Sequence, residues 1–580
     1  MALFRTRSAA VFGIDAQPIE VEVDLYPGGS QRDFIVVGMP DLAVRESRER
    51  IRSALSNCGF GYPTKAVTIN LAPANVRKEG AGFDLPMAAA VLGAMGIVRP
   101  CSETLLSGEL SLDGGLRPVR GVLSMAVCAR KNGFHSLIVA RQNAAEAAVV
   151  EGLKVYGLTH LGEVAGLLND PEKFTPVQPV LQEGDSHGAD WPDFADVRGQ
   201  TTAKRALEVA AAGAHNLLLV GPPGSGKTML ARRLPGILPP MSFEEALETS
   251  QVHSVAGVLA PDQGLLSERP FRSPHHSVSN AGLLGGGVGT PRPGEVSLAH
   301  HGVLFLDEFT EFERSALEML RQPVEERSVT IARSQMSLTF PSDFMLVAAM
   351  NPCPCGFFSD NSHTCRCTGG IIQRYLGKIS GPLLDRIDLH IEVPAVAYQE
   401  MRSKSTGASS AEMRGRVLAA RARQSERGFV NANIPPGQLR EFCPLDAAGE
   451  KALEMAIRRL ALSARAHDRI LKVARTIADI AALNRSRPNT SPRPYNTGHS
   501  TGIIGSRVRT ACKGGDADAR RRILGQLRKT TVGGFRKAIT APPARKLDLR
   551  RVRDSGRVVP ETQPHRRLRL VNETGLDEVR

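Results

Sequence analysis

The sequence predicts an α/β fold organised around a parallel β-sheet, and three observations predict it. An apolar run at 216–220 leads, as a buried strand does, into a glycine-rich turn and then a helical stretch. Two further apolar runs, at 303–306 and 344–350, each end in polar residues. Strands alternating with helices build a parallel sheet flanked by helices.

The glycine-rich turn fits the phosphate-binding pattern G-x-x-x-x-G-K-[ST], in which backbone N–H groups close on phosphate oxygens. It consists of Gly221, Pro222, Pro223, Gly224, Ser225, Gly226, Lys227 and Thr228. Lys227 is expected to reach the β- and γ-phosphates of ATP, and the Thr228 hydroxyl to bind Mg²⁺. A chance match is the alternative, but the strand–turn–helix context argues against it.

The positive charge of the chain is concentrated at its C-terminal end. The formal net charge is +14, yet residues 483–580 alone hold 23 basic and 8 acidic side chains. The other 482 residues therefore hold 50 basic and 51 acidic side chains. The body of the protein is therefore close to neutral. Residues 483–580 are predicted to be a disordered, solvated extension, with a basic arm for nucleic acid as the alternative.

Hydropathy and cysteine usage predict a cytoplasmic protein that contacts no membrane. The most apolar window, 86–98, suits a buried helix and is too short to span a bilayer. The nine cysteines show no disulfide framework, which fits a reducing compartment.

Residues 1–169 are predicted to form a compact α+β domain. Apolar and acidic residues alternate from Ile19 to Leu25, the period of a half-buried strand, and 66–71 is a second strand. Asp41 can cap a helix that runs to about Asn57, and a glycine turn then opens the apolar helix 86–98. The proline-rich stretch 170–193 is interpreted as an interdomain linker.

This front domain resembles the Lon-protease-like domain of the ComM/YifB family, a branch of the magnesium-chelatase-like AAA+ ATPases. Lon domains use a Ser–Lys dyad, but Gly80-Ala81-Gly82 offers no Ser, and Leu123 stands where the Lys would lie. Arg120 stays protonated and cannot act as the base. We therefore expect a scaffold or assembly role and no peptidase activity.

The second and third apolar strands end in candidate catalytic residues. Asp307 and Glu308 follow the second strand; Asp307 is expected to hold the Mg²⁺ water shell and Glu308 to polarise the attacking water. Asn351 follows the third strand, and by resemblance to AAA+ proteins it is sensor 1, which orients that water. Ordinary turn residues are the alternative in both cases.

Two arginines complete the predicted catalytic set. The segment 380–388 resembles the arginine-finger segment of the family, so Arg386 would reach the γ-phosphate bound by a neighbouring subunit. A surface ion cluster of Arg386 with Asp385 and Asp388 is the alternative. By resemblance to Ser-x-Arg lids, Arg465 is the sensor 2 residue, whereas Arg469 and Arg475 are interpreted as ordinary helix-surface charges.

Two insertions distinguish the ATPase core at 194–394 from a generic AAA+ module. The glycine-rich loop 271–295 resembles the family signature; its His275 and His276 are interpreted as loop residues, with metal binding as the less favoured alternative. The segment 329–340 predicts a β-hairpin with its tip near Arg333 and Ser334. That tip either faces the pore of a ring or is plain surface.

Four cysteines gather within a short insert after the third strand. Cys353, Cys355, Cys365 and Cys367 suit tetrahedral Zn²⁺, although the C-x-C spacing is tighter than the usual C-x₂-C. His363 is a further candidate ligand. Clustered buried thiols are an equally weighted alternative.

The resemblance runs to about Ile480, inside the helical lid predicted at 395–482, and then stops. The sequence changes abruptly there to an Arg/Pro/Ser-rich composition, which an altered reading frame would produce. We state this as a hypothesis, and sequencing the source DNA across codons 478–490 tests it.

The resemblance implies a homo-hexameric ATPase that binds ATP and Mg²⁺ between subunits and acts on single-stranded or branched DNA. In this interpretation the protein is a branch-migration helicase that promotes integration of single strands in natural transformation and recombination. The alternative is a magnesium-chelatase-like motor that remodels a protein partner.

Overall fold

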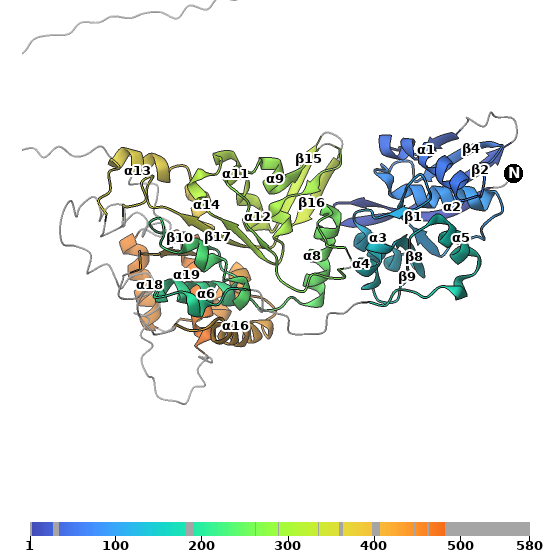
Figure 1. The fold of residues 1–580 in the computed structure, drawn as a ribbon. Coiled ribbons are helices and arrows are strands. Elements are labelled where there is room, and N and C mark those ends of the chain that lie inside the picture. Colours follow the sequence, from blue (N-terminus) through green and yellow to red (C-terminus); the bar gives the residue numbers. More distant parts are fainter. Residues whose placement is uncertain are drawn as a thin grey trace, which may run out of the picture. The chain divides into compact units, whose positions relative to one another are not determined.

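The computed structural model describes residues 3–26, 34–179, 191–261, 263–287, 289–333, 336–358, 363–396, 407–445, 447–460 and 463–481. Figure 1 shows the arrangement of their helices and strands. Ser334, residues 180–190 of the expected linker, and the expected extension 483–580 with its reading-frame hypothesis lie outside the described residues.

The front segment contains a mixed seven-stranded sheet in the order β3-β4-β2-β1-β5-β8-β9. Its strands are β1 (Phe4–Phe12), β2 (Asp15–Tyr26), β3 (Phe34–Val37), β4 (Ala66–Ala72), β5 (Thr104–Leu106), β8 (Ser136–Ala140) and β9 (Lys154–Leu158). The alternation predicted for β2 is confirmed, because Ile19, Val21 and Val23 are fully buried while Glu20 stays partly exposed.

Helices of the front segment follow from local sequence signals. Helix α1 (Leu42–Asn57) begins where the Asp41 carboxylate accepts the backbone N–H of Val44 at 2.8 Å, as predicted. Helix α2 (Asp84–Ala94) is buried from Asp84 to Leu92, which explains its uniformly apolar sequence. The remaining long helices are α3 (Val122–Lys131) and α5 (Leu161–Asn169).

The central sheet has the order β11-β14-β17-β10-β18, and its neighbouring strands pair in parallel. The strands are β11 (Phe271–Arg272), β14 (Val303–Leu306), β17 (Met345–Met350), β10 (Leu217–Val220) and β18 (Leu389–Glu392). Strands β10, β14 and β17 are buried along their whole length, which is why their sequences are unbroken apolar runs. The predicted α/β core is confirmed.

Two smaller features of the core bear on the insertions. Strands β15 (Ser328–Arg333) and β16 (Met336–Pro341) pair antiparallel, so the predicted hairpin is confirmed. The glycine-rich insertion forms helix α9 (Asn280–Leu284) and the short pair β12 (Gly285–Gly286) and β13 (Arg292–Pro293), and then enters α10 (Glu295–Leu298). Helix α12 (Arg321–Glu326) precedes the hairpin.

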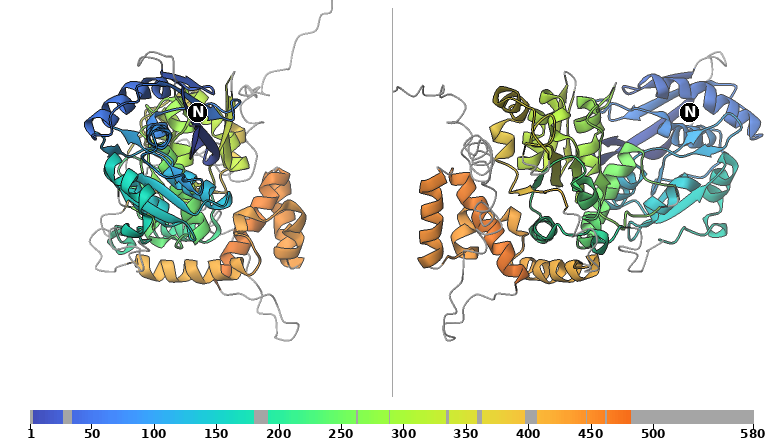
Figure 2. Two further views of the ribbon diagram at one scale, coloured as in Figure 1. Left: turned by 90° about the vertical axis from the view of Figure 1, so that its right-hand side faces the viewer. Right: turned by 60° about the vertical axis from the view of Figure 1, so that its left-hand side comes forward.

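The lid consists of helices drawn in orange in Figure 2. They are α16 (Ser410–Ser425), α17 (Leu439–Phe442), α18 (Ala447–Leu460) and α19 (Ala464–Ile480). Helix α16 packs on α6 (Thr201–Gly213), where Arg421 and Gln424 donate to the carbonyls of Ala211 and Ala212 at 2.9 and 2.8 Å.

A buried polar network joins α19 to His215 and Asn216, the two residues that precede β10. His215 Nε2 lies 2.8 Å from Thr476 Oγ1, and His215 Nδ1 lies 3.3 Å from the Asp388 carboxylate. The backbone N–H of Asn216 also donates to Asp388, at 3.2 Å. Hydrogen-bonded groups in a low-dielectric interior are costly to leave unpaired, so this network fixes where the lid docks.

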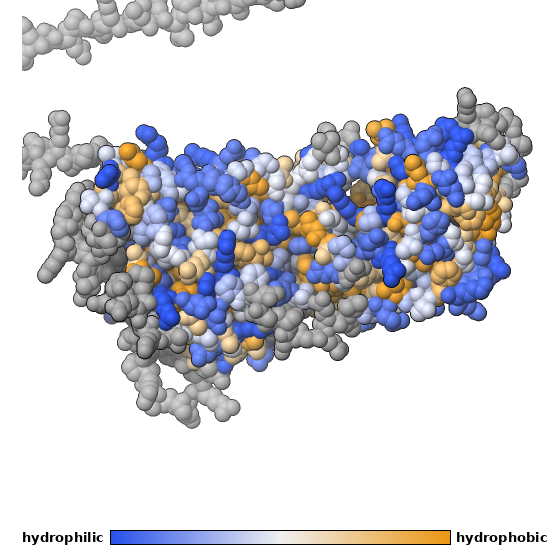
Figure 3. All heavy atoms as spheres, viewed as in Figure 1, coloured by the Kyte–Doolittle hydropathy of each residue, from blue (hydrophilic) through white to orange (hydrophobic). Residues whose placement is uncertain are grey.

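The surface in Figure 3 mixes hydrophilic residues with small groups of apolar ones. Among the residues that the structure describes, we find no helix with the length and apolar content needed to cross a bilayer.

Candidate active site

The parallel sheet gathers the predicted site residues along one edge. Val220 pairs with Met350, and Leu306 pairs with Ala348, so β10, β14 and β17 end close together. The phosphate loop, Asp307 and Asn351 are the next residues after these three strand ends. Carboxyl ends of parallel strands form the usual ligand crevice of such sheets.

Lys227 lies at the centre of this edge. Its Nζ donates to the carbonyls of Gly221 and Pro222 at 2.8 and 2.9 Å and to Asn351 Oδ1 at 3.2 Å. Burial lowers the pKa of the Lys227 ammonium, although the Asp307 charge raises it. The structure therefore brings the predicted phosphate-binding lysine and the predicted sensor 1 residue into contact.

Thr228 and Asp307 are paired in the way that a shared metal site requires. The Thr228 hydroxyl donates to Asp307 Oδ2 at 2.6 Å, and the other oxygen of Asp307 accepts the backbone N–H of Glu308 at 2.9 Å. A hydroxyl and a carboxylate in contact offer the oxygen ligands that Mg²⁺ prefers. These two residues fit the ion.

Glu308 carries an exposed carboxylate on a backbone in the left-handed region, with φ of 51°. Its Oε2 lies 3.0 Å from Nδ1 of His276, a residue of the glycine-rich insertion. No local sequence pattern predicts that these two residues meet. The signal for the pairing is the parallel alignment of β11 with β14, which brings the residues beyond both strands to one edge.

The insert that follows Asn351 touches the phosphate loop. Gly356 has a φ of +83°, and a Cβ built on it would lie 2.3 Å from Cδ of Pro223. A side chain here would collide with the loop, so the close approach depends on glycine. The cysteine insert therefore packs directly against the phosphate loop.

Arg386 and Arg465 meet at one acidic residue. Arg386 is hydrogen-bonded to Glu325 of α12, and Arg465 Nη2 lies 3.7 Å from the other oxygen of Glu325. In the described part of the chain, neither arginine forms a hydrogen bond or ion pair with the phosphate loop. The cluster of Arg386 with Asp385 and Asp388 does not form, because Asp388 is bound by His215 and Asn216.

The interpretation of Arg469 and Arg475 as surface charges is wrong. Both side chains are only 13% exposed. Arg469 donates to the carbonyl of Ile387 at 2.9 Å, and Arg475 donates twice to the buried Asp479 carboxylate, at 3.0 and 2.6 Å. The acceptor of Arg469 lies far away in the sequence, and the acceptor of Arg475 lies four residues along the same helix. The apolar periodicity of α19 reveals neither contact.

The four cysteines of the insert converge as predicted. Cys353 Sγ lies 3.3 Å from Cys355 Sγ and 3.8 Å from Cys365 Sγ, and Cys355 Sγ lies 3.6 Å from Cys365 Sγ. With Cys367 these sulfurs all fall within 4.8 Å of one another. The predicted alternative ligand His363 is not in this group; its ring lies against Phe357, with centroids 4.7 Å apart.

The environment of these thiols favours a bound cation. Burial raises the pKa of Cys355, but backbone N–H groups of Phe357 and Arg366 and the neighbouring thiols more than offset this and lower it to about 6. Burial and the neighbouring thiols raise the pKa of Cys353 to about 12. Thiols crowded this closely ionise together only when a positive charge joins them, so the donor set fits Zn²⁺.

A second cluster, formed by Glu248, His300 and His301, does not suit a metal. His300 Nδ1 accepts the backbone N–H of Asp343 at 2.9 Å, so the proton of this neutral imidazole resides on Nε2. That nitrogen lies 3.2 Å from the Glu248 carboxylate, outside hydrogen-bond geometry, and in this tautomer it has no lone pair for a cation. His301 Nε2 lies 3.2 Å from the same carboxylate, and we interpret Glu248 and His301 as a structural hydrogen-bonded pair.

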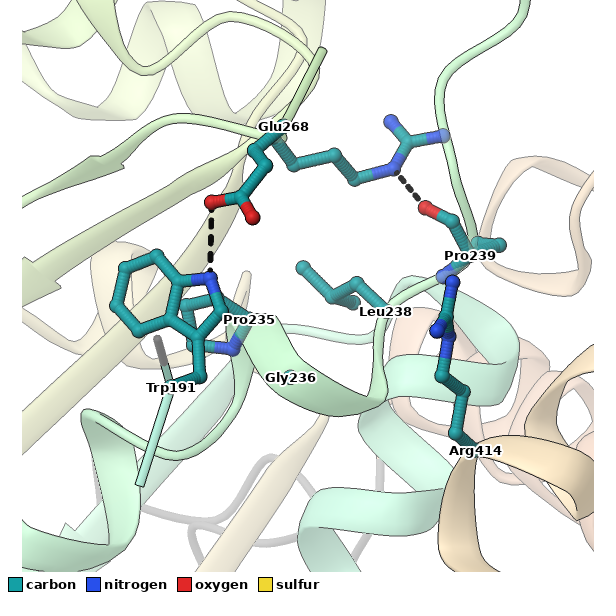
Figure 4. Close-up of a pocket in the computed structure, with 8 residues that line it drawn as sticks. Trp191, Pro235, Gly236, Leu238, Pro239, Glu268 and Arg414 are labelled. Carbon is teal, nitrogen blue, oxygen red and sulfur yellow. Dashed lines mark hydrogen bonds between the residues drawn. The ribbon is translucent and has the colours of Figure 1, made fainter. Parts of the chain in front are cut away.

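Figure 4 shows a hollow away from these residues, lined by Trp191, Pro235, Gly236, Leu238, Pro239, Glu268, Arg269 and Arg414. Trp191 Nε1 donates to Glu268 Oε2 at 3.0 Å across it. None of the predicted site residues lines this hollow.

Comparisons with protein families match three parts of the chain. The family described as magnesium chelatase, subunit ChlI, matches residues 193–401. A second, subunit ChlI of Mg-chelatase, matches 21–143, and its C-terminal family matches 407–490, beyond the Ile480 limit expected from the sequence.

Curated relatives cover most of the chain. The uncharacterized protein YifB of Escherichia coli is 44% identical over 491 residues, which are 83% of this chain and 94% of YifB. Competence protein ComM of Haemophilus influenzae is 43% identical over 491 residues, with the same coverage of both chains. A shorter similarity, 28% identity over 189 residues, covers 28% of this chain and 33% of Lon protease 2 of Bacillus subtilis.

Proposed function

The chain belongs to the magnesium chelatase family that includes YifB and ComM, and from this premise we propose that it is a Mg²⁺-dependent ATPase that drives a DNA motor. The observation that carries the ATPase proposal is the assembly of Lys227, Thr228, Asp307, Glu308 and Asn351 along one sheet edge.

Each residue has a defined part in this proposal. The phosphate loop, from Gly221 to Thr228, binds the nucleotide phosphates, and Lys227 exchanges its two carbonyl partners for phosphate oxygens. Thr228 and Asp307 hold Mg²⁺, which neutralises charge that develops on the phosphates. Glu308 accepts a proton from the attacking water, and Asn351 orients that water.

The arginine arrangement supports a homo-oligomer, which we propose to be a hexameric ring. Arg386 and Arg465 share Glu325 and, among the described residues, form no hydrogen bond or ion pair with their own phosphate loop. Arg386 would act on nucleotide bound by a neighbouring subunit, and Arg465, as sensor 2, would report the nucleotide state to the lid. Glu325 would release both arginines when phosphate competes for their charge.

The DNA substrate rests on the family and on the name of the competence protein relative. We propose that the motor acts on single-stranded or branched DNA, as a branch-migration helicase in recombination. A chelatase-like motor that remodels a protein partner is the alternative, since the family is named for magnesium chelatase. The front segment, with a fully buried Leu123 in place of a dyad lysine, would be a Lon-like scaffold without peptidase activity.

The test is ATP hydrolysis measured with and without branched DNA, alongside Lys227→Ala and Glu308→Gln variants. Stimulation by DNA that both variants abolish is expected. Hydrolysis that ignores DNA and responds to a protein partner would refute the DNA motor and favour the alternative.

We also propose a Zn²⁺ ion held by Cys353, Cys355, Cys365 and Cys367. Bound zinc would fix the insert against the phosphate loop and would take no part in chemistry. Metal analysis of purified protein should find one zinc per chain, and its absence from protein purified without chelators would contradict this assignment.

A further inference from the structure

We infer that His276 is a positioning residue for Glu308: its Nδ1–H holds one carboxylate oxygen and leaves the other free to accept a proton from water. This inference rests on the proposed function, in which Glu308 is the general base. The two residues lie 3.0 Å apart, between His276 Nδ1 and Glu308 Oε2.

The sheet explains why a histidine of the insertion reaches this place. Phe271 pairs with Val303 and Arg272 with Leu304, so the chain leaving β11 and the chain leaving β14 emerge at the same edge. His276 and Glu308 are each four residues beyond Arg272 and Leu304, the last paired positions. The parallel pairing therefore delivers both chains to one edge, where the turns that hold His276 and Glu308 lie side by side.

The histidine is itself held in place. Its ring lies against His275, with centroids 4.0 Å apart, and makes an edge contact with Phe312 at 6.4 Å. Arg272 makes two hydrogen bonds of 2.7 Å to Glu295, which closes the base of the insertion. A side chain fixed in this way can orient a partner without losing further freedom.

Glu308 needs a partner that orients it, because its carboxylate is largely exposed to solvent. Its side chain is 58% exposed. Over the residues that the structure describes, His276 is the side chain recorded within ion-pair distance of its carboxylate. A general base must lie within hydrogen-bond reach of the proton that it takes, so a carboxylate that samples several rotamers acts only part of the time.

The experiment is steady-state ATP hydrolysis without DNA, so that a chain indifferent to DNA still tests the inference. His276→Phe keeps the ring but cannot donate, and His276→Asn places an N–H near the position of Nδ1. We expect His276→Phe to lower kcat about 10- to 100-fold, less than the loss of the base, with KM for ATP within about twofold. His276→Asn should restore most of kcat. His275→Phe, which preserves the ring contact, should behave as the wild type.

A double-mutant cycle separates this role from a general structural one. If His276 acts through Glu308, His276→Phe should have little further effect in single turnovers of a Glu308→Gln chain. An unchanged or increased kcat in His276→Phe, failure of His276→Asn to restore it, or an additive effect in the cycle would overturn the inference. A wild-type chain without hydrolysis would overturn both this inference and the proposed ATPase, whereas hydrolysis insensitive to DNA would count against the DNA proposal alone.

Discussion

Replacing Asp479 by Asn should loosen the packing of α19 against the rest of the lid. The Asp479 carboxylate is fully buried and accepts hydrogen bonds from Arg475 at 2.6 Å, Arg427 at 2.5 Å and Asn431 at 2.8 Å. Asn431 also donates to Thr476 Oγ1 at 3.0 Å, and Thr476 contacts His215, which lies just before β10. The substitution keeps the shape of the side chain and removes its charge.

The stability lost in Asp479→Asn follows from the two arginines that lose their charged partner. The Arg427 and Arg475 side chains are 16% and 13% exposed, so both guanidinium groups would stay largely buried beside a neutral amide. Breaking a buried ion pair on one side costs about 3 to 5 kcal/mol. Burial alone raises the pKa of Asp479, but these donors more than offset it and hold the pKa below its ordinary value.

The lowered pKa of Asp479 decides the pH at which the variant should be compared with the wild type. A lowered acid pKa means that the stabilisation is complete above the ordinary carboxyl pKa and is lost as pH falls through the folded-state value. At neutral pH, amide hydrogen exchange in α16 and α19 should therefore lose roughly two to four orders of magnitude of protection in Asp479→Asn. Asp468→Asn, at a side chain 39% exposed on the same helix, is the control and should change little. Protection that stays within about threefold of the wild type would refute the reasoning.

Three further predictions concern the nucleotide edge. Burial lowers the pKa of Lys227, and nucleotide phosphates should raise this pKa again, so ATP binding at alkaline pH should be accompanied by uptake of a proton. Calorimetry in buffers of different ionisation enthalpy measures this proton uptake. The uptake should disappear in Lys227→Arg, because the guanidinium stays protonated. Gly356→Ala should weaken ATP binding about tenfold in a fluorescence titration, because its Cβ would collide with the phosphate loop, whereas Gly370→Ala meets nothing within 4 Å and should bind normally. Cys355→Ser should purify with well under one zinc per chain by elemental analysis, while Cys58→Ser, outside the cluster, should keep its metal.

The parts predicted correctly from sequence are those with a local signal. The central strands are apolar because both faces are buried, and the polar residues just beyond them could be placed at one edge from chain order alone. The hairpin and the Asp41 cap follow from patterns a few residues long.

The missed features depend on partners far apart in sequence. Strand β11 has two residues, too few to show a period, so nothing in the sequence placed His276 beside Glu308. Arg475 looks like a surface charge in a helical pattern because its position is polar; only the packing of α16 and α19 around Asp479 buries it. Glu325 likewise meets Arg386 and Arg465 only in the folded chain.

The left-handed backbone at Glu308 has a consequence for directed evolution of this protein. A side chain there holds a conformation that glycine or asparagine adopts more easily, at a cost of about 1 kcal/mol. A library selected only for survival of heating would therefore enrich glycine or asparagine at position 308, and its most heat-resistant members would be those that have lost the proposed base. Selection for robustness needs a simultaneous demand for turnover.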